Sequence, residues 1–110
     1  MSMYNLSIVL LIPDAHKQAV NDLAEAAGYG PDNLSRPLVD ADGNQWWGGH
    51  TMAAPVFLQE MSEVTDYPDA MAALVMSVND TTQPDCPSPL EHWQTALAAN
   101  NLTQPSEATL

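Results

Sequence analysis

The pattern of apolar and polar positions predicts how the first part of the chain folds. Leu6–Ile12 is a short apolar run, rich in β-branched residues, that ends at Pro13. Such a run favours a strand that is buried on both faces. Asp14 can then N-cap a helix that ends at Gly28. This helix is predicted from four apolar residues that recur at helical spacing, namely Val20, Leu23, Ala24 and Ala27.

A strand pair is predicted next. Residues 30–33 (GPDN) form a turn cluster, and Leu34–Val39 follows as the second predicted strand. Pro37 lies inside this strand and has no N–H to donate, which favours a position at the edge of a sheet. Residues 40–44 contain an Asp-Gly pair, so they predict a hairpin loop with a return strand at Gln45–Met52.

The second half begins with a short helix and a further strand. Pro55 suits the first position of that helix. The apolar residues that the helix is expected to bury are Phe57, Leu58 and Met61. Met71–Val78 is the next apolar run and predicts a second interior strand. Where this strand starts is open, because residues 70–74 (AMAAL) also suit a helix.

The last predicted helix opens at a capping sequence. In Ser88-Pro89-Leu90-Glu91 the serine and glutamate stand three positions apart, and proline occupies the first helical position. The helix is expected to end near Asn100-Asn101. Its expected buried residues are Leu90, Trp93, Ala96 and Leu97. Residues 103–110 have little to bury, so they predict a frayed tail.

The order of elements is therefore β-α-β-β-α-β with an added C-terminal helix. This order predicts an α+β domain of the ferredoxin-like, split β-α-β class, with a mostly antiparallel sheet and the helices on one face. Leu6–Ile12 and Met71–Val78 are expected as the central strands. Residues 1–102 are expected to form a single domain, followed by the tail.

Charge limits the classes of partner. The 110 residues include 14 acidic and only 2 basic side chains, for a net charge of −12. Charged residues make up 15% of the chain, below the usual ~25%, so the imbalance comes from missing cations and not from an excess of acids. Lys17 and Arg36 alone cannot displace the counterions of a nucleic acid or attract an anionic membrane. We therefore expect neither nucleic acid nor membrane as a direct partner.

Three segments resemble a recurrent type of small protein encoded in phage and prophage genomes. They are GYGPDNLSRPL (28–38), WWGGHTMAAPVF (46–57) and ALVMSVND…HWQTALAANNL (73–102). The resemblance covers most of the chain and implies a phage origin, but none of these segments is a catalytic signature. The doubled Trp46-Trp47 and the acidic segment 60–69 depart from the type.

The cellular compartment is predicted from cysteine and hydropathy. Cys86 is the only cysteine, so no intrachain disulfide forms, which fits an intracellular protein. Leu6–Ile12 is too short to span a bilayer and lacks the basic flank and cleavage site of a signal peptide. With a phage origin, these features predict the host cytoplasm, with incorporation into the virion as a second destination.

The densest group of unusual residues is Trp46, Trp47 and His50. Adjacent residues on a strand face opposite ways, so one tryptophan is expected to point inward and the other outward. In one interpretation the outward tryptophan and His50 anchor a partner, because tryptophan is enriched at binding hot spots. In the other, which we favour, both tryptophans pack in the core, one of them beneath the C-terminal helix beside Trp93.

No metal, cofactor or catalytic site is predicted. Asp40 and Asp42 resemble the start of a calcium loop, but the glycine and the terminal acid of that loop are misplaced, and a hairpin turn explains both residues. The three histidines and Cys86 lack ligand-pair spacing. His16 and His92 lie in first turns of predicted helices and are expected to be solvated. No catalytic motif occurs.

Four acidic residues, Glu60, Glu63, Asp66 and Asp69, recur every three positions. They could mimic phosphates or bind a basic groove, but a solvated surface is the more frequent meaning of such a run. The function predicted is thus protein–protein interaction without catalysis, most simply as a minor virion accessory or decoration protein. The alternative is a soluble acidic inhibitor of a host nucleic-acid-binding enzyme. Acidic residues at ordinary density favour the first.

Overall fold

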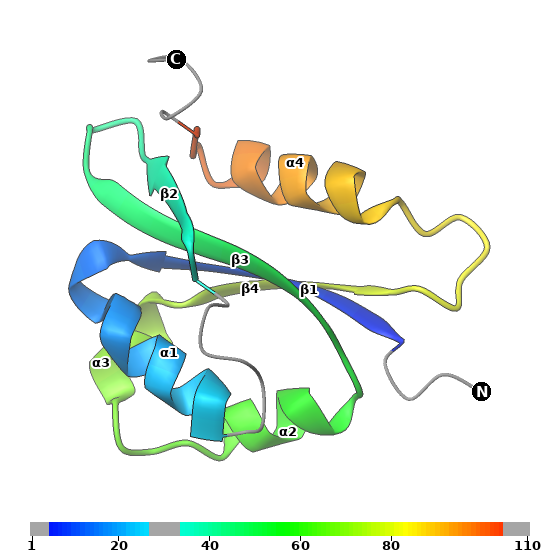
Figure 1. The fold of residues 1–110 in the computed structure, drawn as a ribbon, viewed down its shortest axis with the longest axis horizontal. Helices are drawn as coiled ribbons and strands as arrows, with labels where there is room; N and C mark the ends of the chain where they lie inside the picture. The colour runs from blue at the N-terminus through cyan, green and yellow to red at the C-terminus, as the bar shows by residue number, and fades with distance from the viewer. Residues whose placement is uncertain (1–4, 27–33, 105–110) are drawn as a thin grey trace.

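The computed structural model of this chain describes residues 5–26 and 34–104. Its elements in chain order are β1 (Leu6–Pro13), the 3-10 turn η1 (Asp14–His16), α1 (Lys17–Ala26), β2 (Arg36–Val39), β3 (Gln45–Ala53), α2 (Val56–Ser62), α3 (Pro68–Ala73), β4 (Val75–Asp80) and α4 (Pro89–Ala99). The predicted turn at 30–33 and the helix end at Gly28 lie outside the described residues. Figure 1 shows the arrangement.

The strands form one antiparallel sheet in the order β2-β3-β1-β4. In the strand register, Val9 of β1 lies opposite His50 of β3 on one side and Ser77 of β4 on the other. β1 and β3 are therefore interior, while β2 and β4 form the two edges. This confirms the α+β class, the interior position of the first strand, and the edge position of the strand that contains Pro37.

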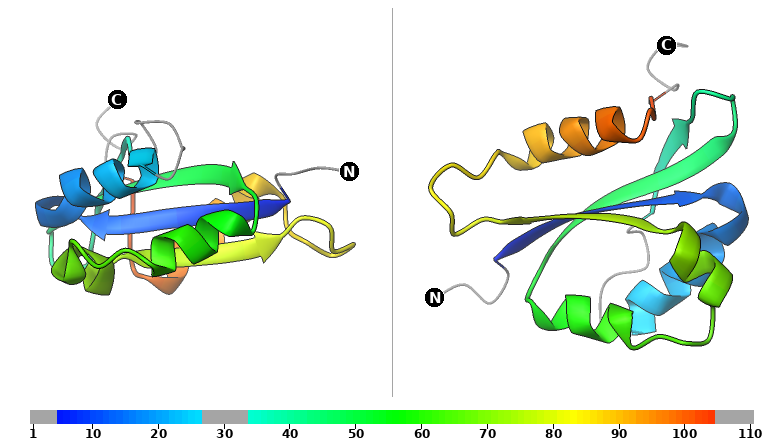
Figure 2. Two further views of the ribbon diagram at one scale, coloured as in Figure 1. Left: turned by 90° about the horizontal axis from the view of Figure 1, so that it is seen from below. Right: turned by 180° about the vertical axis from the view of Figure 1, so that it is seen from behind.

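Helices cover both faces of the sheet, whereas the sequence analysis predicted the helices on one face. Figures 1 and 2 show α1, α2 and α3 on one side and α4 on the other. Even-numbered residues of β1 belong to a core with the first three helices; its fully buried members include Ile8, Leu10, Val20 and Phe57. Odd-numbered residues of β1 belong to a core with α4; its members include Val9, Leu11, Trp93 and Leu97. Burial from both sides explains why Leu6–Ile12 lacks a polar alternation.

The prediction of Met71–Val78 as an interior strand is wrong. Residues 68–73 form α3, which begins at Pro68 in the first helical turn, and the strand begins only at Val75. Alanine-rich residues favour the helix, as the sequence had left open. β4 then lies at an edge and is only partly buried, so the second interior strand is β3.

The capping sequence of α4 is confirmed. The Ser88 side chain accepts a hydrogen bond from the backbone N–H of Glu91, and the Glu91 carboxylate accepts one from the N–H of Ser88. The predicted burial of Leu90 is wrong, because its side chain is 63% exposed. α4 instead buries His92 along with Trp93, Ala96 and Leu97.

Beyond α4 the chain returns to the sheet. Leu102 is buried in the α4 core, and Thr103 exchanges backbone hydrogen bonds with Val39 of β2 at 2.9 and 3.0 Å. The outer side of β2 is thus bridged at one point, whereas within the described ranges β4 pairs only with β1. No helix in the described ranges is long and apolar enough to cross a membrane.

Candidate functional site

The two tryptophans at the start of β3 lie on opposite faces of the sheet, and both are half-buried. Trp46 packs against the α4 core, and its Nε1 donates a hydrogen bond to Asp40 Oδ2 at 2.9 Å. Trp47 packs against the opposite core, and its Nε1 donates to Asp14 Oδ1 at 2.6 Å. Lys17 Nζ lies 3.9 Å from the centre of the Trp47 ring, a cation–π distance. Each tryptophan therefore has a structural role within the domain.

Gly48 lies where α4 packs closely against the sheet. A Cβ atom at this position would lie 2.7 Å from Cη2 of Trp93, 2.8 Å from Cδ1 of Leu38 and 3.0 Å from Cδ2 of Leu11. These distances are too short for ordinary carbon contacts. The glycine in the tryptophan-rich segment therefore allows Trp93 to lie directly on β3.

His50 begins a buried chain of hydrogen bonds that crosses the sheet to α4. Its Nε2 lies 2.7 Å from Ser7 Oγ in β1, and Ser7 Oγ lies 2.8 Å from Nδ1 of His92 in α4. The other ring nitrogen of His92, Nε2, lies 2.9 Å from Ser77 Oγ in β4. We call these four residues the serine–histidine chain. It joins three strands and one helix.

The burial of Ser7 and His92 limits the chemistry that the serine–histidine chain can perform. A serine hydroxyl beside a histidine nitrogen is the geometry that activates a nucleophile. Here, however, Ser7 is 2% and His92 3% exposed, and both ring nitrogens of His92 are occupied by serines. A substrate cannot reach the Ser7 hydroxyl in this arrangement. The groups satisfy one another's hydrogen bonds inside the α4 core, which is what buried polar groups require.

The electrostatic setting favours the neutral form of both histidines. Burial lowers the pKa of His50 below its usual 6.5, and the nearby positive charge of Arg36 lowers it further. Burial also lowers the pKa of His92, and His50 contributes to the same shift. Two neutral rings can share Ser7, since one donates to the hydroxyl oxygen while the other accepts its proton.

A small hollow opens beside His50. It has a volume of about 190 Å³ and is lined by Arg36, His50, Pro89, Leu90 and Trp93. The Arg36 guanidinium carbon lies 4.6 Å from the centre of the Trp93 ring. We call this site the Arg36 hollow. It is one place where the serine–histidine chain meets the surface, through the half-buried His50.

The loop between β2 and β3 is an Asp-Gly hairpin turn, as predicted. Asp40 Oδ1 accepts hydrogen bonds from the backbone N–H groups of Asp42 and Asn44, each at 2.9 Å. The bond from Asn44, with those from Trp46 and Asp42, lowers the Asp40 pKa below 3.8. Gly43 has φ +83°, which glycine adopts without strain. The Asp40 carboxylate thus serves to close the turn.

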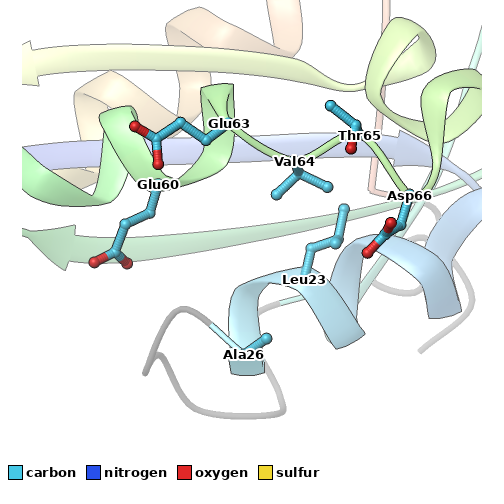
Figure 3. Close-up of a pocket in the computed structure, with 7 residues that line it drawn as sticks. All are labelled: Leu23, Ala26, Glu60, Glu63, Val64, Thr65 and Asp66. Atoms are coloured by element: carbon cyan, nitrogen blue, oxygen red, sulfur yellow. The ribbon is translucent and has the colours of Figure 1, made fainter.

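Three of the four acidic residues from segment 60–69 line one hollow of about 510 Å³ between α1 and the segment after α2. Figure 3 shows the carboxylates of Glu60 and Glu63 on one side of this hollow and Asp66 on the other, with Val64 and Leu23 between them. Asp69 lies apart, exposed in the first turn of α3. Across residues 5–26 and 34–104, no three His, Cys, Asp or Glu side chains are placed to hold a metal ion.

Sequence reasoning missed three members of the serine–histidine chain, namely Ser7, Ser77 and His92. The prediction that His92 is solvated is wrong, because Ser7 and Ser77 satisfy both of its ring nitrogens inside the core. One signal was present: Ser7 is the only polar residue in Leu6–Ile12, and a hydroxyl inside a doubly buried strand needs a partner. The identity of that partner depends on how α4 packs, which local patterns do not specify.

Comparisons with protein-family models, with curated proteins and with solved structures find no match to this chain. The functional argument therefore rests on the sequence and on the geometry described above.

Proposed function

We propose that this chain is a non-enzymatic binding domain that adds an extended segment of a larger protein to the free edge of β4. The observation that carries the proposal is the contrast between the two sheet edges. β2 has four residues, contains Pro37 and is bridged by Thr103. β4 has six residues without proline or lysine, and among the residues that the structure describes it pairs only with β1. Proteins that protect a sheet edge use very short strands, proline or charged side chains, especially lysine, and the one charge in β4 is Asp80 at its last position.

The surroundings of β4 indicate the chemistry of its partner. Val78 is 37% exposed, so it offers an apolar contact to a neighbouring strand. At the end of β4, Asp80 and Asp85 line a hollow of about 230 Å³ together with Asn79, Gln83, Cys86 and Pro87. A strand bound along β4 would place a side chain near these two carboxylates. We therefore propose a partner segment that is extended, partly apolar and basic near one end.

The serine–histidine chain supports a role without catalysis. The hydroxyl that has the geometry of a nucleophile, Ser7, is buried and shared between two histidines. Catalysis requires a reacting group that contacts its substrate. We propose accordingly that the chain catalyses no reaction and needs no cofactor.

The resemblance to small phage-encoded proteins suggests where such a partner occurs. A domain that binds through a sheet edge, as proposed here, fits a minor virion accessory protein that attaches to a larger structural subunit. We propose this role, with the host cytoplasm as the place of synthesis. This chain has only two basic residues. Attachment along β4 does not require a basic surface, so the proposed role is compatible with that composition.

Particle composition tests the proposal. Quantitative mass spectrometry of purified particles from the encoding phage should detect the chain at a fixed ratio to a structural subunit. A photo-crosslinking residue at position 78 should join it to that subunit, and one at position 56 should not. Val78→Lys should reduce incorporation at least fivefold, whereas Val56→Lys, at a 51% exposed position on α2, should leave it unchanged. Absence of the chain from particles, despite abundance in infected cells, would contradict the proposal.

The alternative function, an acidic inhibitor of a host nucleic-acid-binding enzyme, is favoured by the hollow that Glu60, Glu63 and Asp66 share. Against it, the apolar side chains of Val64 and Leu23 separate the carboxylates, unlike the closely spaced charges of a phosphate backbone. The inhibitor role predicts binding that collapses as salt rises and that Glu60→Gln with Glu63→Gln abolishes. Binding along β4 predicts that neither higher salt nor the double substitution changes the affinity much.

We also propose that the domain belongs to the ferredoxin-like, split β-α-β class with an added helix. What supports this is the interior position of β1 and β3, with β2 and β4 flanking them. Two features depart from the simplest member of the class: α2 and α3 stand where one helix is expected, and α4 covers the second face. An experimental structure with β1 at a sheet edge would contradict the classification.

A further inference from the structure

The Arg36 hollow contains one of only two basic side chains in a chain with 14 acidic residues. Arg36 is exposed, its guanidinium lies over the Trp93 ring, and His50 lines the same hollow. Among the described residues, no carboxylate or carbonyl pairs with its guanidinium. Such a group, with five N–H donors, has bonding capacity that residues 5–26 and 34–104 do not use.

We propose that the Arg36 hollow binds a small organic monocarboxylate that carries an apolar or aromatic body. A guanidinium and a carboxylate are both planar, so two parallel N–H···O bonds can join them edge to edge. The Trp93 ring contacts the guanidinium from one side and holds it at the hollow. The edge of the guanidinium is then available to the ligand.

The walls of the hollow indicate the body of the ligand. Pro89, Leu90 and Trp93 provide apolar surface, and Leu90 is 63% exposed although it is a large aliphatic residue. A binding site for a small molecule combines such apolar walls with one or two polar groups that fix its orientation. The volume of about 190 Å³ equals the share of about six water molecules, which suits a single ring.

The net charge of the chain favours a ligand with a single negative charge. At −12, the domain repels anions at a distance, and the repulsion grows with the charge of the ligand. One guanidinium offsets one carboxylate but not a phosphate dianion. A monocarboxylate therefore gains the local pairing with Arg36 at the smallest long-range cost.

His50 links the hollow to the buried serine–histidine chain. Its Nε2 bonds to Ser7, and its Nδ1 has no hydrogen bond to a described residue. If Nδ1–H donates to the ligand carboxylate, then Nε2 accepts the proton of Ser7, and Nδ1–H of His92 donates to the Ser7 oxygen. Binding would thus fix the tautomers of both histidines, a signature that a non-specific ion contact would not produce.

The test is a titration of the full-length, isotope-labelled chain with sodium benzoate at constant ionic strength, followed by NMR. We expect saturable shifts at the Arg36 and Trp93 side-chain N–H groups, and a change at the His50 ring nitrogens that reports a single tautomer. Arg36→Gln should weaken binding at least fivefold. Lys17→Gln is the matched control, because Lys17 also lies over a tryptophan ring, and it should leave binding unchanged.

Further arms separate the proposal from its competitors. Benzamide, which has the same ring without the charge, should bind at least fivefold more weakly, and so should inorganic phosphate. Leu90→Ser, at an exposed position that the fold does not need, should weaken benzoate but not acetate. Equal binding of benzamide or phosphate, retained binding in Arg36→Gln, or equal shifts around Lys17 and Trp47 would overturn the assignment.

Discussion

At the scale of single residues, two small side chains on β1 and β3 determine how α4 packs. Ser7 and Gly48 each contact one of two consecutive residues of that helix. The hydroxyl of Ser7 meets His92, and the missing side chain of Gly48 makes room for Trp93. The helix is therefore held by a polar contact and a close steric contact side by side. Each contact leads to a prediction.

Gly48→Ala should destabilise the domain by about 1–3 kcal/mol, because the new methyl group overlaps the Trp93 ring and two leucines. Urea unfolding measures the change. Trp93→Phe removes the atom at 2.7 Å, so the double variant Gly48→Ala with Trp93→Phe should be more stable than the sum of the two single changes predicts. Strict additivity in this cycle would show that the two residues do not meet.

Ser7→Ala should cost about 1–3 kcal/mol, since it leaves Nδ1 of the buried His92 without its partner. Ser35→Ala, at an exposed serine, provides the control and should change stability by less than about 0.5 kcal/mol. Thermal or urea unfolding of the two variants gives the comparison. Equal stability of both would contradict the hydrogen-bond geometry of the serine–histidine chain.

At the scale of elements, the serine–histidine chain fastens α4 to three strands through groups that titrate. Both histidines have pKa values lowered from 6.5 in the folded state by burial. Below pH 6.5 the unfolded chain therefore binds more protons than the folded chain. This contribution to stability is fully present above pH 6.5, and it is lost as the pH falls from 6.5 through the lower folded-state values.

We accordingly expect the urea midpoint to fall between pH 7.5 and pH 5. His50→Gln and His92→Gln should each reduce this slope, whatever they do to stability at pH 7.5. His16→Gln, which alters the one histidine outside the serine–histidine chain, should retain the slope. The lowered pKa values of Asp40 and Asp80 act below pH 3.8 and so do not enter this range. If His50→Gln and His92→Gln both left the pH dependence of the urea midpoint unchanged, the mechanism would be contradicted.

The elements could be predicted from the sequence wherever local chemistry was decisive. Leu6–Ile12, the Asp-Gly hairpin and the capping box of α4 each follow from residues close together in the chain. The failures concern partners far apart. The strand at Met71–Val78 and the solvation of His92 were misjudged because sheet position and helix docking depend on packing between remote segments. The candidate hollow was missed for the same reason, since β2, β3 and α4 each supply part of it.

At the scale of the whole molecule, acidic side chains greatly outnumber basic ones. Both cations, Lys17 and Arg36, lie over tryptophan rings, and in the described part of the chain neither forms an ion pair. The carboxylates of the described residues thus repel one another within a radius of gyration of 13.9 Å. At about 0.01 M salt the screening length is about 30 Å, so most of these charges interact. Self-repulsion of this kind destabilises the compact state.

Salt should therefore stabilise this protein. We expect the melting temperature to rise as sodium chloride increases from about 0.01 M to about 0.2 M, because the screening length shortens most steeply over this range. Choline chloride should give the same rise, since the effect depends on ionic strength and not on the ion. A variant with Glu60→Gln, Glu63→Gln and Asp66→Asn carries three fewer charges and should gain less. A melting temperature that stays flat or falls below 0.2 M would mean that attractive pairs outweigh repulsion. The same salt series also constrains binding, because attachment along β4 through backbone bonds and Val78 should persist at salt concentrations that strengthen the fold.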